Sequence, residues 1–598
     1  MANTTMGWTI AEWQDAYRRG ESPRALLGAL LDAKHATDPA WISLATPEQL
    51  AAQIDAASPD QPLYGVPFAI KDNIDALGFE TTAACPDYRY QPEADAEVVQ
   101  ALKHAGAILI GKTNLDQFAT GLVGTRSPWG AVPNAFDDAT IAGGSSSGSA
   151  AVVARGIVPF ALGTDTAGSG RVPAGLNNIV GLKPTRGAIS IRGVVPACRS
   201  LDCVSIFALT TTDAGLIRHH LDSGPNTDPF GRSPALAAAP GCALRTPGPI
   251  HRLAIPSNTE WHGDPLQKAA WEETIGQWRA LGYELIEKDF TTLYAMAALL
   301  YEGPWIAERH AAIGAFINAH PDSINPVVRS IIRRAEPFTA TDAFKGLYRQ
   351  QELRRSLDRE LSDIDALLVP TAPRTPSIEA VAADPVGLNA QLGRYTNFVN
   401  LTDLCALALP GGFREDGLPF GITLISGAWR DQDLQALGAQ WLNHAPTPLG
   451  ATHCERPPEA AAEADGHTIQ VTVVGAHLDG MALNPQLTER GARLVSRTTT
   501  APCYRLYALA GTTPPKPGLR RDPTGAALEV EVWEMPTDRF GSFVSLIPHP
   551  LGMGTVELAD GSWRKGFICE EAGLEGATDI THLGGWRAYS RSLTEHQD

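Results

Sequence analysis

Two clusters rich in serine and glycine hold the residues of this chain that are best suited to acyl chemistry. The first is Gly143-Gly-Ser-Ser-Ser-Gly148, and the second is Gly163-Thr-Asp-Thr-Ala-Gly-Ser-Gly-Arg171. Glycine lets backbone N–H groups approach a ligand closely, and successive N–H groups in a loop bind an anion. A serine hydroxyl becomes a good nucleophile when a neighbouring base takes its proton. Together the clusters indicate a nucleophile beside an oxyanion hole, although either one alone is typical of a structural loop.

A lysine supplies the candidate base. Apolar residues alternate at positions 66, 68 and 70, which predicts a strand that ends at Lys71. A lysine accepts a proton only when it is neutral, and burial lowers its pKa from the usual value of about 10.4. The end of a buried strand would provide that environment. The alternative is a structural ion pair with Asp72, which would keep Lys71 charged.

Two other segments match functional patterns without the context that the chemistry needs. Residues 106–113 match the phosphate-binding P-loop pattern, but their four middle residues are apolar and predict a strand. Residues 144–148 match the nucleophile elbow with Ser146 as nucleophile, yet a polar loop precedes them where a buried strand is required. No histidine lies between His104 and His219, so a histidine base would have to come from a distance. We favour neither pattern.

The order and sequence context of three residues resemble the amidase signature family. These are Lys71 in Phe-Ala-Ile-Lys-Asp-Asn, Ser145 in the first cluster and Ser169 in the second. The resemblance extends over roughly residues 5 to 445. It implies that Ser169 is the nucleophile, that Ser145 relays protons from a peptide bond held cis, and that Lys71 is the final base.

The loop before Ser169 is the predicted oxyanion hole. Its donors would be backbone N–H groups from Thr166 to Ser169, chiefly those of Thr166, Ala167 and Gly168, because such groups stabilise the negative charge that develops during acyl transfer. We expect the neighbouring Asp165 and Arg171 to brace the loop rather than to take part in the chemistry.

Details around the nucleophile narrow the resemblance to allophanate hydrolases. They are Thr-Ala-Gly-Ser-Gly-Arg-Val-Pro-Ala around Ser169, the segment 197–203 and the terminal segment 576–587. This resemblance implies hydrolysis of allophanate to ammonia and N-carboxycarbamate, with Tyr301 and Arg309 binding the substrate. The planar fork of arginine suits a carboxylate. Taken alone, an arginine such as Arg309, on a helix opened by Pro304, is more often a solvated surface residue than a substrate ligand. The alternative function is that of a general small-molecule amidase or a component of an amidotransferase.

Alternating strands and helices predict an α/β fold. We expect a large domain over residues 1–445, with a mixed β-sheet core flanked by helices. Residues 446–466 are rich in Pro, Ala and Glu without apolar periodicity and predict a linker. Residues 467–598 predict a smaller, strand-rich α+β domain, in which residues 543–547 are one of the expected strands.

The smaller domain has a resemblance of its own. Residues 473–484 and 528–533 are similar to γ-glutamyl-cyclotransferase-like domains, but residues 539–556 contain no acid where that family carries its catalytic one. Cyclotransferase activity is therefore not expected. The allophanate hydrolase resemblance implies that the domain decarboxylates N-carboxycarbamate, with His477 as a participant. A lone histidine after a strand is more often structural, and a role of the domain in assembly is the alternative.

Composition limits the partners. The chain has 66 acidic residues against 48 Lys and Arg, a net charge of -18, which disfavours binding of nucleic acid through a basic face. Its eight cysteines are too sparse for a disulfide framework. With neither a signal peptide nor an apolar stretch of membrane length, we expect a cytoplasmic protein without a membrane partner.

We expect no cofactor, no metal ion and a homodimer. No biotinyl-lysine motif appears in the sequence. The carboxylation that makes allophanate is therefore expected to belong to another protein, a urea carboxylase.

Overall fold

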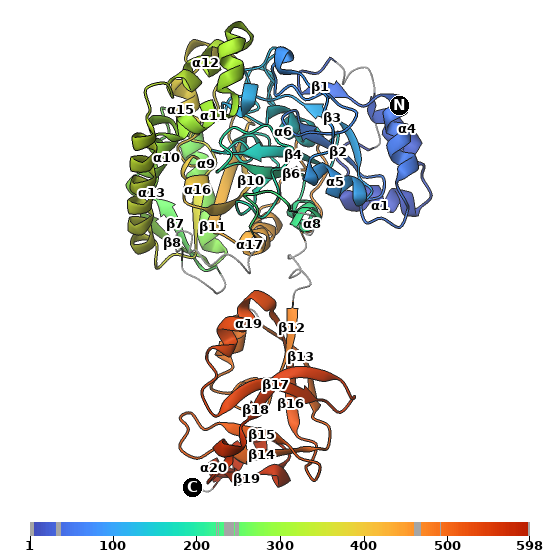
Figure 1. The fold of residues 1–598 in the computed structure, drawn as a ribbon, viewed down its shortest axis with the longest axis vertical. Coiled ribbons are helices and arrows are strands. Elements are labelled where there is room, and N and C mark those ends of the chain that lie inside the picture. The colour runs from blue at the N-terminus through green and yellow to red at the C-terminus, as the bar shows by residue number, and fades with distance from the viewer. Residues whose placement is uncertain are drawn as a thin grey trace. The chain divides into compact units, whose positions relative to one another are not determined.

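The computed structural model describes residues 5–31, 37–222, 224, 226–232, 244, 250–459, 468–490 and 492–595. The chain divides into a large unit, formed by Met1–Arg245 and Ile250–Ala462, and a small unit that contains Glu463–Asp598 (Figure 1). Among the described residues, no helix combines the length and the apolar character that crossing a membrane requires.

The residues of the predicted linker divide between two groups. Residues 446–459 pack on the large unit, where Leu449 joins the hydrophobic core and the Ala451 N–H donates to the Ala154 carbonyl at 2.7 Å. Residues 460–466 lie outside the described residues.

A mixed sheet of 11 strands runs through the large unit, in the order β1-β3-β2-β4-β6-β5-β10-β11-β9-β7-β8. The strands are β1 (Trp41–Leu44), β2 (Pro67–Lys71), β3 (Ile108–Thr113), β4 (Phe160–Asp165), β5 (Val180–Lys183), β6 (Cys203–Ala208), β7 (Arg252–Pro256), β8 (Glu284–Lys288), β9 (Ala366–Pro370), β10 (Leu404–Phe413) and β11 (Pro419–Gly427). The predicted α/β class, with a mixed sheet and a smaller strand-rich unit, is confirmed.

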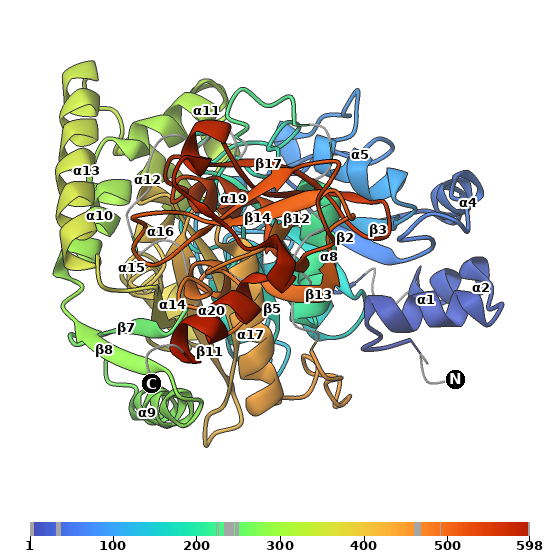
Figure 2. The same ribbon diagram turned by 90° about the horizontal axis from the view of Figure 1, so that it is seen from below.

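Helices cover both faces of this sheet (Figures 1 and 2). Side chains alternate between the faces of a strand, and in β9 Ala366 and Leu368 belong to one hydrophobic cluster while Leu367 and Val369 belong to another. The helices of the large unit are α1 (Ile10–Arg18), α2 (Pro23–Gly28), α4 (Pro47–Ala56), α5 (Glu97–His104), α6 (Ser147–Ala154), α7 (Val172–Leu176), α8 (Thr211–Asp222), α9 (Pro265–Ala280), α10 (Thr291–Glu302), α11 (Trp305–Ala319), α12 (Pro326–Arg333), α13 (Ala340–Glu360), α14 (Ile378–Ala383), α15 (Gly387–Leu392), α16 (Phe398–Leu401) and α17 (Asp431–His444).

Three neighbouring strands bring the candidate residues together. Strand β2 pairs in parallel with β3, where Lys71 lies opposite Thr113, and also with β4, where Ile70 lies opposite Leu162. Because the carboxyl ends of parallel strands meet at one edge of a sheet, the segments that follow β2, β3 and β4 converge there. Lys71 ends β2 and Asp165 ends β4, so the sheet itself positions the site.

The small unit contains a five-stranded sheet, β13-β16-β12-β18-β17, and a three-stranded sheet, β15-β14-β19. Its strands are β12 (Thr468–Val473), β13 (Arg493–Thr499), β14 (Tyr504–Ala508), β15 (Pro517–Arg521), β16 (Glu529–Pro536), β17 (Leu551–Glu557), β18 (Trp563–Cys569) and β19 (Thr578–Asp579), and its helices are α18 (Pro485–Thr488), α19 (Thr537–Val544) and α20 (Trp586–Glu595).

The strand predicted over residues 543–547 is wrong. Helix α19 ends at Val544, and turns with N–H bonds from Leu546 and Ile547 follow it. Phe540, Phe543 and Ile547 all pack against the core of the small unit. Their spacing of three and four residues is that of one helix face. An apolar run this short does not distinguish the helical period of 3.6 residues from the strand period of two.

Candidate active site

The amine of Lys71 lies fully buried at the end of β2. Its Nζ lies 2.8 Å from Ser145 Oγ and 2.8 Å from Thr164 Oγ1. Burial lowers the pKa of Lys71 to about 7, because the charged ammonium loses its contact with water. The alternative ion pair is formed by a different lysine, since Lys112 Nζ lies 3.3 Å from Asp72 Oδ1.

Buried carboxylates oppose this effect on Lys71. Asp116, Asp202 and Asp165 each favour the charged ammonium and raise its pKa. Asp202 is itself buried, and burial raises its pKa to about 6. Its Oδ1 accepts the Thr166 hydroxyl. The balance leaves an amine that gains or loses its proton near neutral pH.

Ser145 follows a cis peptide bond with Gly144, as the resemblance implied. The Ser145 carbonyl accepts the Asp116 N–H at 3.0 Å. A Cβ atom at Gly144 would lie 2.3 Å from Asp116 Oδ2, so glycine is required there. Ser146, the candidate of the elbow pattern, instead donates its hydroxyl to the Thr164 carbonyl at 3.1 Å.

Ser169 lies in the loop after β4, and its hydroxyl donates to the Gly121 carbonyl at 3.5 Å. Within the described ranges it forms no hydrogen bond with Ser145, so the chain of contacts from Lys71 reaches Ser145 and ends there. A hydrogen bond of 3.5 Å is weak. Rotation of the Ser169 side chain away from Gly121 therefore costs little.

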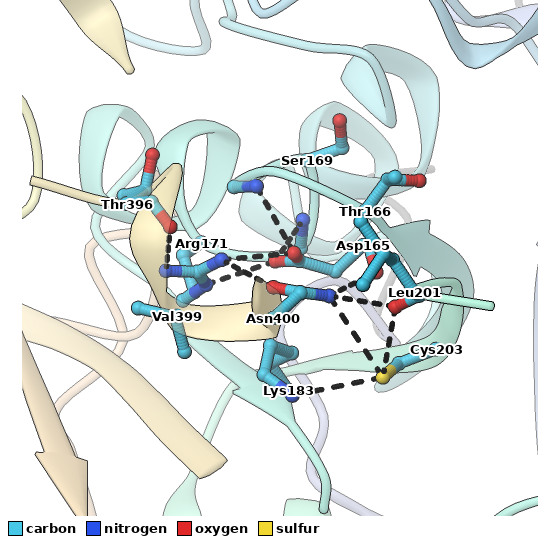
Figure 3. A network of polar contacts seen from close by, with 12 residues as sticks. Asp165, Thr166, Ser169, Arg171, Lys183, Leu201, Cys203, Thr396, Val399 and Asn400 are labelled. Carbon is cyan, nitrogen blue, oxygen red and sulfur yellow. Dashed lines mark hydrogen bonds and ion pairs between the residues drawn. The ribbon is translucent and has the colours of Figure 1, made fainter. Parts of the chain in front are cut away.

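A buried ion pair holds the loop that carries Ser169 (Figure 3). Arg171 donates to Asp165 through both Nε and Nη2, each at 2.9 Å, and through Nη1 to the Thr396 carbonyl at 3.1 Å. The same carboxylate accepts the N–H groups of Gly168 at 3.0 Å and Gly170 at 2.9 Å. Burial alone would raise the pKa of Asp165, but the charge of Arg171 holds it below its usual range. The pair braces the loop, as predicted.

The predicted oxyanion donors are not equivalent. Because the Gly168 N–H donates to Asp165, it is already engaged, which differs from the expectation for this residue. The N–H groups of Thr166, Ala167 and Ser169 donate to no acceptor among the described residues, although all three residues are nearly fully buried. Buried N–H groups are rarely left unpaired. These three donors are available to a ligand oxygen.

The segment 116–126, which was not predicted from the sequence, organises the site. Asp116 Oδ2 accepts the N–H groups of Val123 at 3.1 Å and Gly124 at 3.0 Å, and its Oδ1 accepts the Arg126 N–H at 3.0 Å. One carboxylate therefore accepts three backbone N–H groups and fixes the conformation of this segment. The available signal was its position three residues after the end of β3, at the edge of the sheet where Lys71 also lies.

The same segment contacts three parts of the candidate site. The Gly121 carbonyl holds the Ser169 hydroxyl, and the Leu122 carbonyl accepts the Gly144 N–H at 2.8 Å. Thr120 Oγ1 accepts Arg309 Nη1 at 3.3 Å. The segment thus links the nucleophile, the cis peptide and the predicted substrate arginine.

Arg309 lies on α11 and is only 2% exposed, which excludes the solvated surface position. Besides its contact with Thr120, its Nη2 lies 3.5 Å from Tyr301 Oη, and its guanidinium carbon lies 5.3 Å from the centre of the Tyr301 ring. Its Nε has no hydrogen-bond partner, and Arg309 forms no ion pair within the described part of the chain. Asp202 and Glu308 act on Arg309 only from a distance. A buried cation that no carboxylate contacts is costly, so an anionic ligand would complete its surroundings.

The small unit has a cavity of about 250 Å³, and His477 and Lys516 are among the residues that line it. The His477 ring stacks on Phe567 at 5.1 Å and meets Phe543 edge-on at 5.3 Å. Its Nε2 lies 2.9 Å from Gln486 Oε1. Burial lowers the pKa of His477, so the imidazole is neutral near neutral pH.

Comparison with protein families gives two matches. The family described as Amidase matches residues 27–434, and the one described as Allophanate hydrolase C-terminal domain matches residues 469–591. Among solved structures, an allophanate hydrolase from Kluyveromyces lactis is 44% identical, with a TM-score of 0.83, and the match covers 99% of this chain and 100% of that one.

Curated relatives fall into two groups. The urea amidolyase of Saccharomyces cerevisiae is 45% identical over 623 residues, which cover 100% of this chain but 34% of that protein. This chain therefore spans about a third of the length of that relative. A glutamyl-tRNA(Gln) amidotransferase component from Symbiobacterium thermophilum is 36% identical over 62% of this chain and 81% of its own length.

Proposed function

The chain belongs to the amidase family, and we propose that it hydrolyses allophanate to ammonia and N-carboxycarbamate through Ser169, Ser145 and Lys71. One observation carries the proposal: the buried Lys71 amine lies 2.8 Å from the Ser145 hydroxyl and has a pKa of about 7. An amine of this kind is neutral in a large fraction of molecules near neutral pH, and it can accept a proton through the serine beside it.

The proposed reaction begins with proton transfer. Ser145 gives its proton to neutral Lys71 and takes the proton of Ser169, whose Oγ attacks the substrate carbonyl carbon. The oxygen that becomes negative accepts hydrogen bonds from the N–H groups of Thr166, Ala167 and Ser169. Each hydrogen bond would stabilise the transition state by about 3 kcal/mol. The proton returns through Ser145 to the leaving nitrogen, ammonia departs, and water releases the acyl group by the same relay.

Arg309 supports allophanate over a neutral amide. Its guanidinium is buried, contacts neutral oxygens and keeps Nε unpaired. In our proposal the substrate carboxylate binds Arg309 and the hydroxyl of Tyr301, which places the adjacent amide carbonyl at the loop of Ser169. A carboxylate receives two parallel N–H bonds from an arginine, which fixes its orientation as well as its charge.

The proposed source of the substrate is a urea carboxylase, which would attach the carboxylate to urea. Similarity to urea amidolyases supports this partner, since this chain matches about a third of such a protein. The K. lactis urea amidolyase structure is related in the same way, with 44% identity over 37% of its chain.

We further propose that the small unit decarboxylates N-carboxycarbamate in the cavity of His477. A neutral imidazole between aromatic rings, in a cavity that Lys516 also lines, provides a weakly hydrated place for a small anion. Loss of carbon dioxide removes a charged carboxylate, and reduced hydration of that carboxylate favours the step.

The deciding experiment measures ammonia release from allophanate by the full chain. Simple aliphatic amides, and glutamine, are the comparison substrates. We expect allophanate to be turned over, and Ser169→Ala to lose at least about 10³-fold in kcat without a change in melting temperature. Ser146→Ala is the matched control and should stay active, because among the described residues its hydroxyl bonds to the Thr164 backbone alone. Turnover by Ser169→Ala, or equal turnover of neutral amides, would contradict the proposal.

A further inference from the structure

A second cavity of about 430 Å³ lies in the large unit and is separate from the loop of Ser169; we name it the outer cavity. Its walls come from α10, from α15 and from the end of α12, helices that are labelled on one side of the large unit in Figure 1. Tyr301 lines it, and the hydroxyl of Tyr301 accepts Arg309. Asn389 also lines it, and its Oδ1 accepts the Leu122 N–H at 2.8 Å. The wall of the cavity therefore contacts the substrate arginine and the segment that holds Ser169.

The inner wall carries a buried cation, Arg126, which is only 2% exposed. Its Nη1 donates to the Thr120 carbonyl at 2.9 Å and its Nη2 to the Pro385 carbonyl at 2.6 Å. Its Nε has no partner, and it forms no ion pair with any carboxylate in the described ranges. Two carbonyl groups accept hydrogen bonds from this guanidinium, but no carboxylate in the described ranges contacts it to balance its positive charge.

The rim carries further charges. Arg334 is exposed and makes no side-chain hydrogen bond or ion pair in the described part of the chain, while Arg394 pairs with Glu260 at 3.0 Å. Glu302 is the carboxylate among the lining residues and is also exposed. Among the lining residues three arginines stand against one carboxylate. Two carboxylates outside the lining act on two of these arginines, Glu260 on Arg394 and Asp116 on Arg126, so Arg334 is the arginine whose charge is left unbalanced.

This local excess contrasts with the whole molecule, whose net charge is -18. Such a molecule repels a small anion at long range, and the repulsion slows encounter. A cavity with low-dielectric walls and an unbalanced positive charge at its opening has the opposite effect, since it concentrates anions there.

We propose that the outer cavity collects the anionic substrate and delivers it to Arg309, with Arg334 as the steering residue at the rim. This inference rests on the proposed function, because it requires a substrate with a carboxylate. Arg334 touches neither serine nor Arg309, so it acts on the approach of the substrate and not on the chemical step.

The test uses three exposed positions, which avoids unfolding the buried Arg126. Arg334→Gln should lower kcat/KM for allophanate about two- to fivefold at low salt and leave kcat unchanged. Glu302→Gln should raise kcat/KM by a similar factor. Arg333→Gln is the matched control, because Arg333 is the adjacent exposed arginine on α12, pairs with Glu336 at 3.8 Å and does not line the cavity. At high ionic strength the differences should vanish, because salt screens exposed charges beyond about 8 Å under physiological conditions.

A binding measurement separates this inference from the proposed function. Oxamate, a small carboxylate with an adjacent amide, is titrated into each variant by calorimetry. We expect weaker binding to Arg334→Gln than to Arg333→Gln, whatever substrate the enzyme turns over. Equal binding to both, equal kcat/KM of both, or no binding of oxamate to the unmodified chain would overturn the inference. Failure to release ammonia from allophanate, with the oxamate difference intact, would instead overturn the proposed function alone.

Discussion

In the large unit the amine of Lys71 lies among hydroxyls and carboxylates, whereas in the small unit the imidazole of His477 lies between two phenyl rings. The Lys71 amine is fully buried and the His477 ring is half-buried, and burial lowers the pKa of each. The surroundings differ, because Asp116, Asp202 and Asp165 partly counteract the effect of burial on Lys71 and leave its pKa at about 7.

The difference corresponds to what each of the two proposed reactions requires. Cleavage of an amide needs a proton moved twice and an oxyanion stabilised, so the groups must be held in a fixed order by a hydrogen-bonded loop. Loss of carbon dioxide needs mainly a weakly hydrated pocket for a carboxylate. Changes in the large unit should therefore reduce activity by orders of magnitude, and changes in the small unit by a small factor.

The largest effect is expected from Lys71→Met. The variant removes the final base, and ammonia release from allophanate should fall by about 10⁴-fold in kcat. Its melting temperature should not fall, because the amine is fully buried and its charged form is costly there. Stopped assays of ammonia, together with thermal unfolding, measure both quantities.

The control for this variant is Lys103→Met. Lys103 lies on α5 and its Nζ lies 2.8 Å from Asp95 Oδ1. It should keep full activity. Substantial turnover by Lys71→Met would show that another group accepts the proton. The expectation that changes in the large unit have the larger effect on activity would then be wrong.

A smaller effect is expected from Asp116→Asn. The amide nitrogen cannot accept the N–H groups of Val123 and Gly124, so the segment that holds Gly121 should shift. Displacement of about 1 Å at a reacting group costs on the order of 100-fold, and we expect a loss of that size in kcat. Asp137→Asn, at an exposed turn where the carboxylate accepts the Ala139 N–H, is the control. Equal activity of both variants would mean that the segment does not position the nucleophile.

Asp116 also marks the limit of prediction from the sequence. Lys71, Ser145 and Ser169 stand in short contiguous motifs, so their chemistry could be recognised without coordinates. The partners of Asp116 are backbone N–H groups, which leave no trace in residue types. Its role depends on the parallel pairing of β2 and β3, a long-range feature.

Two local features differ from the sequence-based expectation, and the causes are related. Gly168 was expected to donate to an oxyanion, and whether its N–H points to the ligand or to Asp165 depends on the shape of one loop. Residues 543–547 were expected to form a strand, because five residues are too few to separate a period of two from one of 3.6. The fold class was predictable since its signal is spread over many strands and helices.

The pH dependence should distinguish the two units. Lys71 must be neutral to act, so kcat/KM for ammonia release should rise with pH and level off above about 7, the pKa of Lys71. Below that value the rate should fall about tenfold per pH unit, since each unit reduces the neutral fraction tenfold. Initial rates across roughly pH 5 to 9, with the enzyme-free rate subtracted, measure the profile.

Thr164→Val sharpens this test. The Thr164 hydroxyl can accept a hydrogen bond from the Lys71 ammonium and so favours its charged form. Its removal should lower the pKa of Lys71 and move the acidic limb to lower pH. If the acidic limb moved to higher pH, or did not move, the limb would report the titration of a group other than Lys71.

The smallest effect is expected in the small unit, from His477→Asn. This variant should release ammonia at the unmodified rate and release carbon dioxide a few-fold more slowly, about 1 kcal/mol of barrier. The control is His549→Asn, since His549 is 78% exposed and contacts Glu570 at 3.4 Å. Because burial keeps His477 neutral, its contribution should not follow the acidic limb that Lys71 imposes. Parallel recording of both products from one reaction tests this independence. If His477→Asn slows ammonia release as much as carbon dioxide release, the small unit acts on the first step, and the division of chemistry between the two units is wrong.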